Sequence, residues 1–399
     1  MNVLFLSWWF PYPPDNGSRM RIYNLLRQLS RNHAITLLSF SDDPATDSVH
    51  LPTLRQFCAD VKVVRRVPFL PGRWQALRGF FSLWPRFFVE SHSREMEELV
   101  TQRADVHDVI VASQVWTHRY ALAVANRPKV LEELEVAYFC ECHRWEQGLF
   151  WQLRCRPMWW KFRRLVRRLA RQFDAITVVS DQEARLLEEI APVHNLLTVV
   201  PNGVDLSLYN GNLGQPEPDT LIFPGALTFF ANYDAMAYFL EEIYPLVKAR
   251  RPQTVLRITG KTDGVDLSAL PASDGVIFTG YLDDVRPAVA RSWVCVVPLK
   301  VGGGTRLKIL EAMALGTPVV ATSKGAEGLD VTPGKDILIA DEPEAFAEAV
   351  LRLLDEPSLR ARLAAGGRRL VEARYSWQTC ARVLEHTLQQ VVAPRVSTE

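Results

Sequence analysis

The stretch MNVLFLSWWFPYPPDNGSRMRIYNLLRQLSRNHAITLLSF (residues 1–40) is the part of the sequence from which we predict the fold. Residues 2–7 form an uninterrupted apolar run, which is typical of a strand in a parallel sheet that is covered on both faces. Residues 10–17 contain three prolines and a glycine, so they cannot be helical. Residues 18–31 place apolar side chains at helical spacing, and residues 34–40 are apolar again. The stretch therefore predicts one β-α-β unit.

The same alternation of strands and helices continues along the chain in two series. We expect further strands of the first series at residues 61–64, 109–111, 129–131 and 175–179. The second series has expected strands at 221–223, 254–259, 276–278, 294–298, 318–321 and 337–340, with helices near 235–250, 285–292, 306–315, 344–354 and 358–375. Between the two series, residues 201–205 and 210–218 are the clearest linker, because they are rich in Pro, Gly and Asn.

This pattern predicts an α/β protein with two Rossmann-like, doubly wound domains. We place the first domain at residues 1–205 and the second at residues 206–375. Residues 376–399 form a C-terminal helix that we expect to return to the first domain. The chain has 399 residues, 48% hydrophobic residues and a net charge of +1, which is enough material for two cores and shows no sign of disorder.

Cysteine usage and the N-terminus favour a cytoplasmic protein. The six cysteines are scattered, and no charged-then-apolar leader precedes the first predicted strand. Cys140-Glu141-Cys142-His143 has no second Cys/His pair at zinc spacing, so the sequence predicts no metal site.

The most informative loop for ligand binding follows the strand that ends near Pro298. Ligands of doubly wound sheets bind at the carboxyl ends of the strands, and residues 301–304 there read Val-Gly-Gly-Gly directly before a predicted helix. A helix start presents unpaired amides and a positive dipole, Arg306 can fork onto a phosphate, and Lys308 adds a point charge. Glu311 shares the helix face of Lys308 and can accept hydrogen bonds from ribose hydroxyls. The pattern suits a nucleotide diphosphate sugar; the alternative is a glycine turn with exposed cations and a Glu311–Lys308 pair.

A second phosphate-binding segment is expected after the first strand. Gly17 and Ser18 allow backbone amides to approach a diphosphate, and Arg19 or Arg21 would neutralise it. The alternative is a helix start that is capped by Asn16 or Ser18 and carries solvent-facing arginines.

Several short motifs follow one another in the second half of the chain. They read FPGA (223–226), NYD (232–234), FTGYLDD (278–284), VPL (297–299), the glycine stretch, and LEAMALGTPVVAT (310–322). In this order they resemble the donor-binding domain of the retaining family-4 glycosyltransferases, and residues 15–21 and 200–205 also resemble that family. The resemblance implies the GT-B fold, in which two Rossmann-like domains face a central cleft.

The resemblance also implies a reaction and a set of site residues. It implies transfer of a hexose from a UDP- or GDP-linked sugar to a glycan or lipid-linked saccharide, with retention of anomeric configuration. No metal and no other cofactor is expected, because cations and helix amides supply the positive field. The implied donor and phosphate contacts are Gly17, Ser18, Arg21, Gly225, Gly302, Gly303, Gly304 and Thr305. The implied contacts with the base and the ribose are Gly260, Lys261, Tyr281 and Glu311. The implied catalytic residues are Arg306, Lys308 and Glu311.

Three departures from the family pattern matter. Many members have a Glu-x7-Glu pair, but Gly303 occupies the first position here, which resembles the branch with Gly-Gly-x-x-Arg-x-Lys. Residues 226–232 also lack the Arg and Lys that members commonly have. Many relatives have a His after the fifth strand, whereas residues 130–136 have none. Glu132 or Glu135 is a candidate to orient a sugar hydroxyl there, and the alternative is that both are exposed carboxylates at the end of a strand. His118, after the preceding strand, is a further catalytic candidate, although a lone His is more often structural.

The segment from Arg154 to Arg171 has eight basic residues, no acidic one, and interleaved aromatic and aliphatic residues. This pattern is typical of a membrane-surface helix, and the alternative is a packed helix with a solvated basic face. We therefore expect a cytoplasmic protein with a possible peripheral contact to an anionic membrane, and no nucleic-acid partner. Two other functions stay open: a catalytically impaired nucleotide-sugar-binding protein, and an NAD(P)-dependent oxidoreductase, although no Gly-x-Gly-x-x-Gly follows the first strand.

Overall fold

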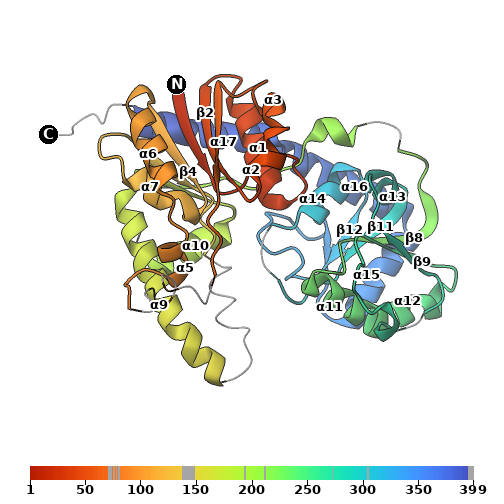
Figure 1. Cartoon of the computed structure of the whole chain (residues 1–399). Helices are drawn as coiled ribbons and strands as arrows, with labels where there is room; N and C mark the ends of the chain where they lie inside the picture. The colour runs from red at the N-terminus through yellow and green to blue at the C-terminus, as the bar shows by residue number, and fades with distance from the viewer. Residues whose placement is uncertain are drawn as a thin grey trace. The chain divides into compact units, whose positions relative to one another are not determined.

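The structure, a computed structural model, describes residues 1–70, 74, 77, 79, 81–136, 149–192, 195–210, 213–271, 273–302 and 305–393. The chain divides into two compact units, which are coloured by residue number in Figure 1. Unit 1 consists of Met1–Asn202 together with the segment from Trp377 onward, and unit 2 consists of Gly203–Ser376. Each unit is described here by itself.

Unit 1 is built on a parallel sheet of seven strands in the order β3-β2-β1-β4-β5-β6-β7. The strands are β1 (Asn2–Ser7), β2 (Ala34–Ser41), β3 (Asp60–Arg65), β4 (Val109–Ser113), β5 (Lys129–Glu132), β6 (Ala175–Val178) and β7 (Leu196–Val199). The first six were predicted from their apolar runs. The seventh was missed because its four residues are only half-buried and stand directly before the Pro-Asn-Gly linker.

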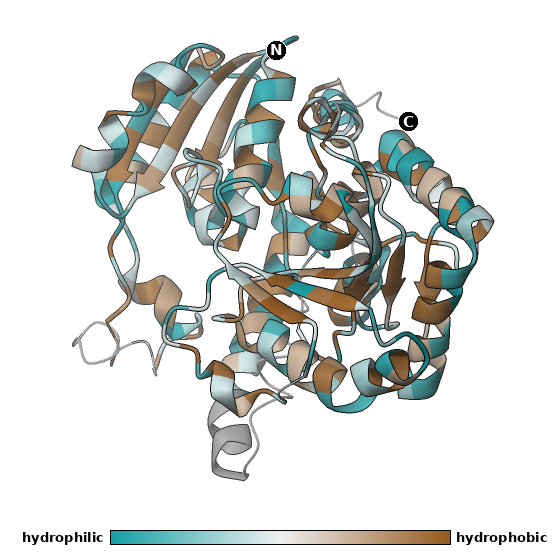
Figure 2. Ribbon diagram, turned by 90° about the vertical axis from the view of Figure 1, so that its right-hand side faces the viewer, coloured by the Kyte–Doolittle hydropathy of each residue, from teal (hydrophilic) through white to brown (hydrophobic). Residues whose placement is uncertain are grey.

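Both faces of this sheet are covered, which explains the uninterrupted apolar runs. Val3 and Phe5 of β1 point into a cluster with α1 (Gly17–Leu29) and α17 (Trp377–Val392). The alternate residues Leu4 and Leu6 point into a second cluster with the helices on the other face. In Figure 2 the strands are accordingly mostly hydrophobic, and the helices beside them alternate between hydrophobic and hydrophilic faces.

The remaining helices of unit 1 are short, with one exception. They are α2 (Pro44–Ser48), α3 (Leu51–Leu54), α5 (Arg86–Glu90), α6 (Arg94–Arg103), α7 (His118–Leu122), α9 (Leu149–Gln172) and α10 (Asp181–Ile190). The long α9 carries the basic segment and contacts α10. Buried Trp377 and Leu384 of α17 pack in the same cluster as Ile22 of α1, which attaches the end of the chain to unit 1.

Unit 2 has a parallel sheet of six strands in the order β10-β9-β8-β11-β12-β13. The strands are β8 (Glu217–Pro224), β9 (Val255–Thr259), β10 (Val276–Gly280), β11 (Ser292–Val297), β12 (Val319–Ala321) and β13 (Leu338–Ile339). The α-helices are α11 (Phe230–Tyr238), α12 (Tyr244–Arg250), α13 (Arg286–Ala290), α14 (Leu307–Ala314), α15 (Pro343–Asp355) and α16 (Pro357–Arg374). Helices and sheet share one core. The two units confirm the predicted fold class, α/β with two Rossmann-like doubly wound domains.

Two boundaries in unit 2 differ from the prediction. The helix expected at residues 235–250 is interrupted by a π-helical turn at Phe239–Ile243. Pro245, at the start of α12, has no N–H to donate to the preceding turn, so the helix begins afresh there. The predicted linker also ends earlier, because β8 begins at Glu217, which pairs with Ser292 of β11.

Candidate functional site

The candidate donor site lies in unit 2, at the carboxyl ends of its strands. The Gly225 N–H after β8 donates to the Thr259 carbonyl at 3.0 Å, and the Gly260 N–H after β9 donates to the Gly280 carbonyl at 2.9 Å. Gly260 has φ +118°, and a Cβ atom there would lie 2.6 Å from the backbone nitrogen of Ala226. The loops after three adjacent strands are therefore in direct contact, and Gly260 is required where two of them meet.

Replacing Gly260 by alanine is expected to lower the free energy of unfolding by about 2–3 kcal/mol, from the unfavourable φ and from the clash with Ala226. Gly264→Ala is the matched control, since Gly264 also has a positive φ (+75°) but has no atom within 4 Å of its ideal Cβ position. The control should lose about 1 kcal/mol. Chemical denaturation of both variants measures the difference, and equal losses would contradict the close contact.

Lys308, on the first turn of α14, is the cation at the centre of this site. Its Nζ donates to Asn232 Oδ1 at 2.7 Å and lies 4.1 Å from the centroid of the Phe223 ring. A Cβ atom on Gly225 would come within 2.8 Å of the same Nζ, so the glycine makes room for the ammonium group. Burial lowers the pKa of Lys308 to about 7. The sequence singled out Lys308 but missed Asn232 as its partner.

Glu311 lies one turn further along α14. It accepts a hydrogen bond from the Tyr209 hydroxyl at 3.1 Å, and burial raises its pKa. The alternative of a Glu311–Lys308 salt bridge is wrong, because within the described ranges neither side chain has an ion pair with the other. Tyr209 was also missed, because it stands at the end of the linker and outside every motif.

Arg306 is buried, contrary to the alternative of an exposed cation. Its Nη2 donates to the carbonyls of Gly302 at 2.7 Å and Lys324 at 3.1 Å. These bonds hold the loop in which Gly302 adopts φ +102°. A direct catalytic role for Arg306 remains a prediction, as does phosphate binding by half-buried Thr305. Gly303 and Gly304 lie outside the described residues.

The predicted base and ribose contacts are near one another. Lys261 Nζ lies 5.6 Å from the centroid of the Tyr281 ring, and both side chains are exposed. Lys261 follows Gly260 directly, and Tyr281 follows Gly280. These two residues and Gly260 therefore stand at one edge of the unit 2 sheet, and their contact with a nucleotide remains a prediction.

Arg21 in unit 1 requires a correction. It was expected to neutralise a phosphate, but its side chain is fully buried. Its Nε donates to Glu132 Oε1 at 2.7 Å, its Nη1 to Asn202 Oδ1 at 2.8 Å, and its Nη2 to the Val200 carbonyl at 2.9 Å. All of its nitrogens are thus used inside unit 1, so the guanidinium ties α1 to the ends of β5 and β7.

Glu132 is corrected with it. It is fully buried, and besides Arg21 it accepts the Ser113 hydroxyl at 2.8 Å. Sequence reasoning missed the next residue, Glu133, which has φ +58° and is buried beside Arg21. Burial raises the pKa of Glu133 well above its ordinary value. Burial also raises the pKa of Glu135, whose predicted contact with a sugar hydroxyl is untested.

The start of α1 is capped by Asn16, as the alternative expected, whereas the solvent-facing position that the alternative gave to Arg21 is wrong. The Asn16 side chain caps the helix by accepting from the Arg19 N–H at 3.1 Å, and Arg19 forms a salt bridge with Asp15 at 3.2 Å. Gly17 is exposed and has open space where a Cβ would stand. Phosphate binding by Gly17 and Ser18 remains a prediction.

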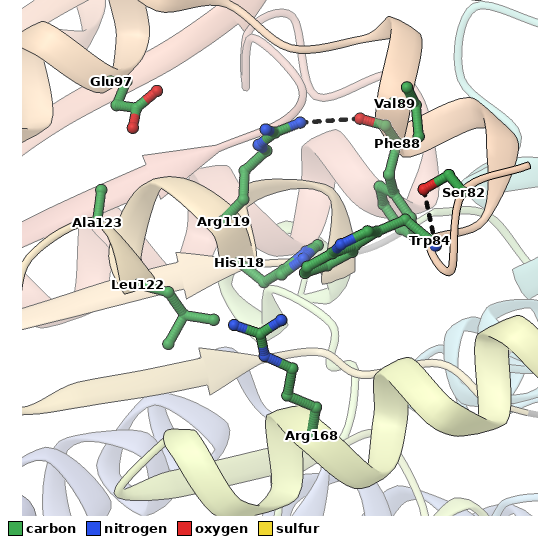
Figure 3. A pocket seen from close by; sticks show the side chains of 10 residues that line it. All are labelled: Ser82, Trp84, Phe88, Val89, Glu97, His118, Arg119, Leu122, Ala123 and Arg168. Atoms are coloured by element: carbon green, nitrogen blue, oxygen red, sulfur yellow. Dashed lines mark hydrogen bonds between the residues drawn. The ribbon is translucent and has the colours of Figure 1, made fainter. Parts of the chain in front are cut away.

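His118 and the basic segment of α9 lie on the face of the unit 1 sheet that is opposite to α1 and α17. His118 is fully buried at the start of α7 and borders a cavity (Figure 3). In α9, Phe162, Leu165, Val166 and Leu169 are buried in the core, whereas Trp160, Arg164, Arg167, Arg168 and Arg171 are exposed. Cys140-Glu141-Cys142-His143 is outside the described residues. Among those that are described, no helix has the length and hydropathy needed to cross a membrane.

Comparison with known proteins points to one family across most of the chain. A family model described as "Glycosyltransferase Family 4" matches residues 15–208, and one described as "Glycosyl transferases group 1" matches residues 218–356. These matches include the segments that carry α1 and the Gly225 to Glu311 site.

Two curated relatives and one solved structure illustrate the similarity. The chain is 26% identical over 57% of its length to a GDP-mannose-dependent phosphatidylinositol monomannoside mannosyltransferase of Corynebacterium glutamicum, of which the match spans 65%. It is 31% identical over 56% of its length to an MMP alpha-(1->4)-mannosyltransferase of Mycolicibacterium hassiacum, of which the match spans 56%. Both matches thus cover less than two thirds of these relatives. The structure of Anabaena HepE in complex with UDP-glucose matches with a TM-score of 0.65 and a sequence identity of 17%. The match covers 98% of this chain and 100% of HepE, so the two proteins share a fold.

Proposed function

Since the chain belongs to the family-4 glycosyltransferases, with the GT-B fold, we propose that it transfers a hexose from a nucleotide diphosphate sugar to a saccharide acceptor. The observation that carries the proposal is Lys308, a cation with an amide partner and no carboxylate partner within the described ranges, held between Gly225 and the Phe223 ring. Such a cation is suited to the diphosphate of a donor.

In this proposal the protein's task is to stabilise the departing diphosphate. Lys308 donates to the phosphate oxygens on which charge develops, and the N-terminal end of α14 adds the positive potential of a helix start. Glu311 accepts from the ribose hydroxyls in exchange for the Tyr209 hydroxyl. In this proposal the acceptor hydroxyl oxygen bonds to the anomeric carbon on the face from which the diphosphate departs, and its proton passes to an oxygen of the departing phosphate, so the configuration is retained. Lys308 and the start of α14 supply the positive charge, so no metal is needed.

The donor nucleotide is UDP or GDP, and the acceptor is a glycan or a lipid-linked saccharide. One relative's name states GDP-mannose as donor and a phosphatidylinositol mannoside as acceptor, and the solved neighbour holds UDP-glucose. Both donors present the same diphosphate to Lys308. The base specificity would reside in residues around Lys261 and Tyr281.

The test is a screen of UDP-glucose, GDP-mannose and NAD by thermal shift, followed by release of UDP or GDP in the presence of acceptors. A donor that binds the folded state raises the melting temperature. We expect a shift with one nucleotide sugar, none with NAD, and release of the nucleotide when an acceptor is present. A shift without release under any acceptor would identify a catalytically impaired binding protein instead, and a shift with NAD alone would favour an oxidoreductase.

Donor affinity is expected to fall as the pH rises through about 7. Burial holds the pKa of Lys308 at about 7, below its ordinary value of 10.5, so the ammonium is charged below that pH and neutral above it. A nucleotide sugar keeps its diphosphate charge in this range. Its affinity should fall about 10-fold or more from about pH 6.5 to about pH 8.5, while the unliganded protein gains stability over the same interval because the buried charge is lost. Titration calorimetry across the range measures this, and a flat profile would contradict the role of Lys308.

Unit 1 also has the surface expected for contact with an anionic membrane, at the inner face of which we place the enzyme. Phe81 is 94% exposed and Trp160 is 54% exposed. Trp160 lines a groove of about 700 Å³ along α9, whose cationic lining residues are Arg163, Arg164, Arg167, Arg168 and Arg171. Because Phe162, Leu165, Val166 and Leu169 of α9 are buried, membrane binding would depend on the arginines and on these exposed aromatic rings.

Reversing the charge of Arg164 and Arg171 is expected to reduce co-sedimentation with phosphatidylglycerol vesicles at low salt at least about 10-fold, since each basic residue near the surface contributes about 1 kcal/mol. The matched control is the double reversal Arg31→Glu and Arg55→Glu, which makes the same change of net charge at exposed positions elsewhere in unit 1. If wild type fails to sediment, or both doubles lose binding equally, α9 is not the membrane contact.

A further inference from the structure

A cavity of about 430 Å³ lies in unit 1 among α5, α6, α7 and α9 (Figure 3). It shares no residue with the site around Lys308. Its lining combines aromatic rings, a histidine and two arginines, the residue types that bind a polar ligand with an apolar face. Neither the family match nor the donor chemistry assigns a role to it.

His118, one of the residues that line this cavity, has a buried hydrogen-bond acceptor without a partner in the described part of the chain. Its Nδ1 is bonded to the Val115 carbonyl, which can only accept, so Nδ1 carries the proton and Nε2 has a free lone pair. Nε2 is buried and has no hydrogen-bond partner among the residues that the structure describes. Burial lowers the pKa of His118 to about 4, so the ring is neutral near pH 7. A buried acceptor without a donor is costly, and a ligand hydroxyl, directly or through one water, would satisfy it.

Aromatic rings form one wall of the cavity. The Trp84 ring stacks on the His118 ring with centroids 5.7 Å apart and an angle of 18° between the planes, and Phe88 meets His118 edge to face at 5.2 Å. Trp84 thus offers an indole surface to the cavity. Such a surface suits the C–H face of a sugar ring, which has hydroxyls around its edge.

Two guanidinium groups stand on either side of these rings. In Figure 3, Arg119 and Arg168 flank His118 and Trp84. Arg119 Nη1 donates to the Phe88 carbonyl at 2.9 Å, and Arg168 lies 5.1 Å from the Trp84 ring centroid while its Nε donates to Gln172 at 2.9 Å. Neither arginine has a salt bridge within the described part of the chain.

The carboxylate of Glu97, which also lines the cavity, is directed to another partner. It lies 3.0 Å from His92 Nε2. Each guanidinium therefore has nitrogens left to bind an anionic group of a ligand by charge-assisted hydrogen bonds.

We propose that this cavity is a separate binding site for an acidic monosaccharide unit, phosphorylated or carboxylated. Arg119 and Arg168 bind the acidic group, Trp84 packs on the sugar ring, and His118 accepts from a hydroxyl. A lipid headgroup could offer a similar anion, but the enclosed aromatic wall favours a sugar. The site does not rest on the proposed transfer, since its residues are distinct from those around Lys308.

Titration calorimetry of the full chain with glucose 6-phosphate, glucose and inorganic phosphate tests the proposal. Glucose 6-phosphate should bind, and glucose and phosphate should each bind at least about 10-fold more weakly, because each lacks half of the contacts. Arg168→Gln, at an exposed position, and Arg119→Gln should each weaken binding about 10-fold or more. Arg171→Gln, on the same helix but outside the cavity, should leave it unchanged, and so should Lys308→Met.

The proposal is overturned by any of four results. They are the absence of binding at millimolar glucose 6-phosphate, equal binding of inorganic phosphate, unchanged binding in Arg168→Gln, and loss of binding in Lys308→Met, which would place the ligand in the donor site. A vesicle arm separates the lipid source: if phosphatidylglycerol vesicles bind through Arg119 while glucose 6-phosphate does not, the cavity recognises a lipid and the saccharide assignment is wrong.

Discussion

Lys308→Met lowers kcat/KM for transfer from the nucleotide sugar by about 100- to 1000-fold, the range found when a buried group that stabilises developing charge is removed. The reason is the position of the ammonium group, whose neighbours are Asn232 and the Phe223 ring. Within the described ranges no carboxylate pairs with this group, so it is available to a phosphate. Much of the loss should fall on kcat, since charge on the diphosphate grows as the bond to the sugar breaks.

Folding and function can be separated in this variant. A methionine of similar length keeps the contact with Phe223 and removes a desolvated charge, so the free energy of unfolding should be unchanged or higher. Lys335→Met is the control, because Lys335 is an exposed lysine of the same unit. Steady-state kinetics together with denaturation curves give both quantities. A Lys308→Met enzyme that retains wild-type turnover would exclude Lys308 from the reaction, and the proposal would lose the observation that carries it.

Arg21→Met is expected to lower the free energy of unfolding by about 3–5 kcal/mol, as breaking a buried ion pair does. The variant leaves Glu132 without its cation in a position with no access to water, and Glu133 loses the same neighbour. It also removes the hydrogen bonds to Asn202 and to the Val200 carbonyl. Urea denaturation measures the loss.

The matched control is Arg19→Met, two residues earlier in the same helix. Arg19 and its partner Asp15 are both partly exposed, so the loss there should be at most about 1 kcal/mol. Replacing Glu132 by glutamine along with Arg21 should recover part of the stability, because the uncompensated charge is then gone. If Arg21→Met is as stable as wild type but binds the donor less well, the residue is a phosphate ligand after all and our correction is wrong.

The buried ion pair shows where sequence reasoning reached its limit. Arg21 follows a glycine-containing loop, which is the pattern of a phosphate-binding segment, and nothing in the local sequence indicates that Glu132 is its partner more than a hundred residues away. The same holds for Lys308 and Asn232, and for Glu311 and Tyr209, which are also far apart in the chain. The local sequence therefore drew attention to these charged residues, but it did not specify their partners in the folded chain.

The membrane segment gives a second example. Its sequence shows arginines interleaved with apolar residues, and both interpretations were compatible with that spacing. The structure buries Phe162, Val166 and Leu169 in unit 1 and leaves Trp160 exposed, so the apolar stripe belongs to the core. Only the packing of neighbouring elements distinguishes a helix whose apolar face meets protein from one whose apolar face meets lipid.

The sequence by itself determined the two α/β units and all of their strands except β7, because apolar periodicity and turn residues act over a few neighbours and do not need distant partners. Tertiary structure alone decided which charges are buried and paired: Arg21 became a structural cation, and Lys308 became a cation that has an amide partner and, in the described part of the chain, no carboxylate partner. The physical reason is that desolvation and ion pairing depend on what the folded chain brings within a few ångströms, and no spacing along the sequence specifies that.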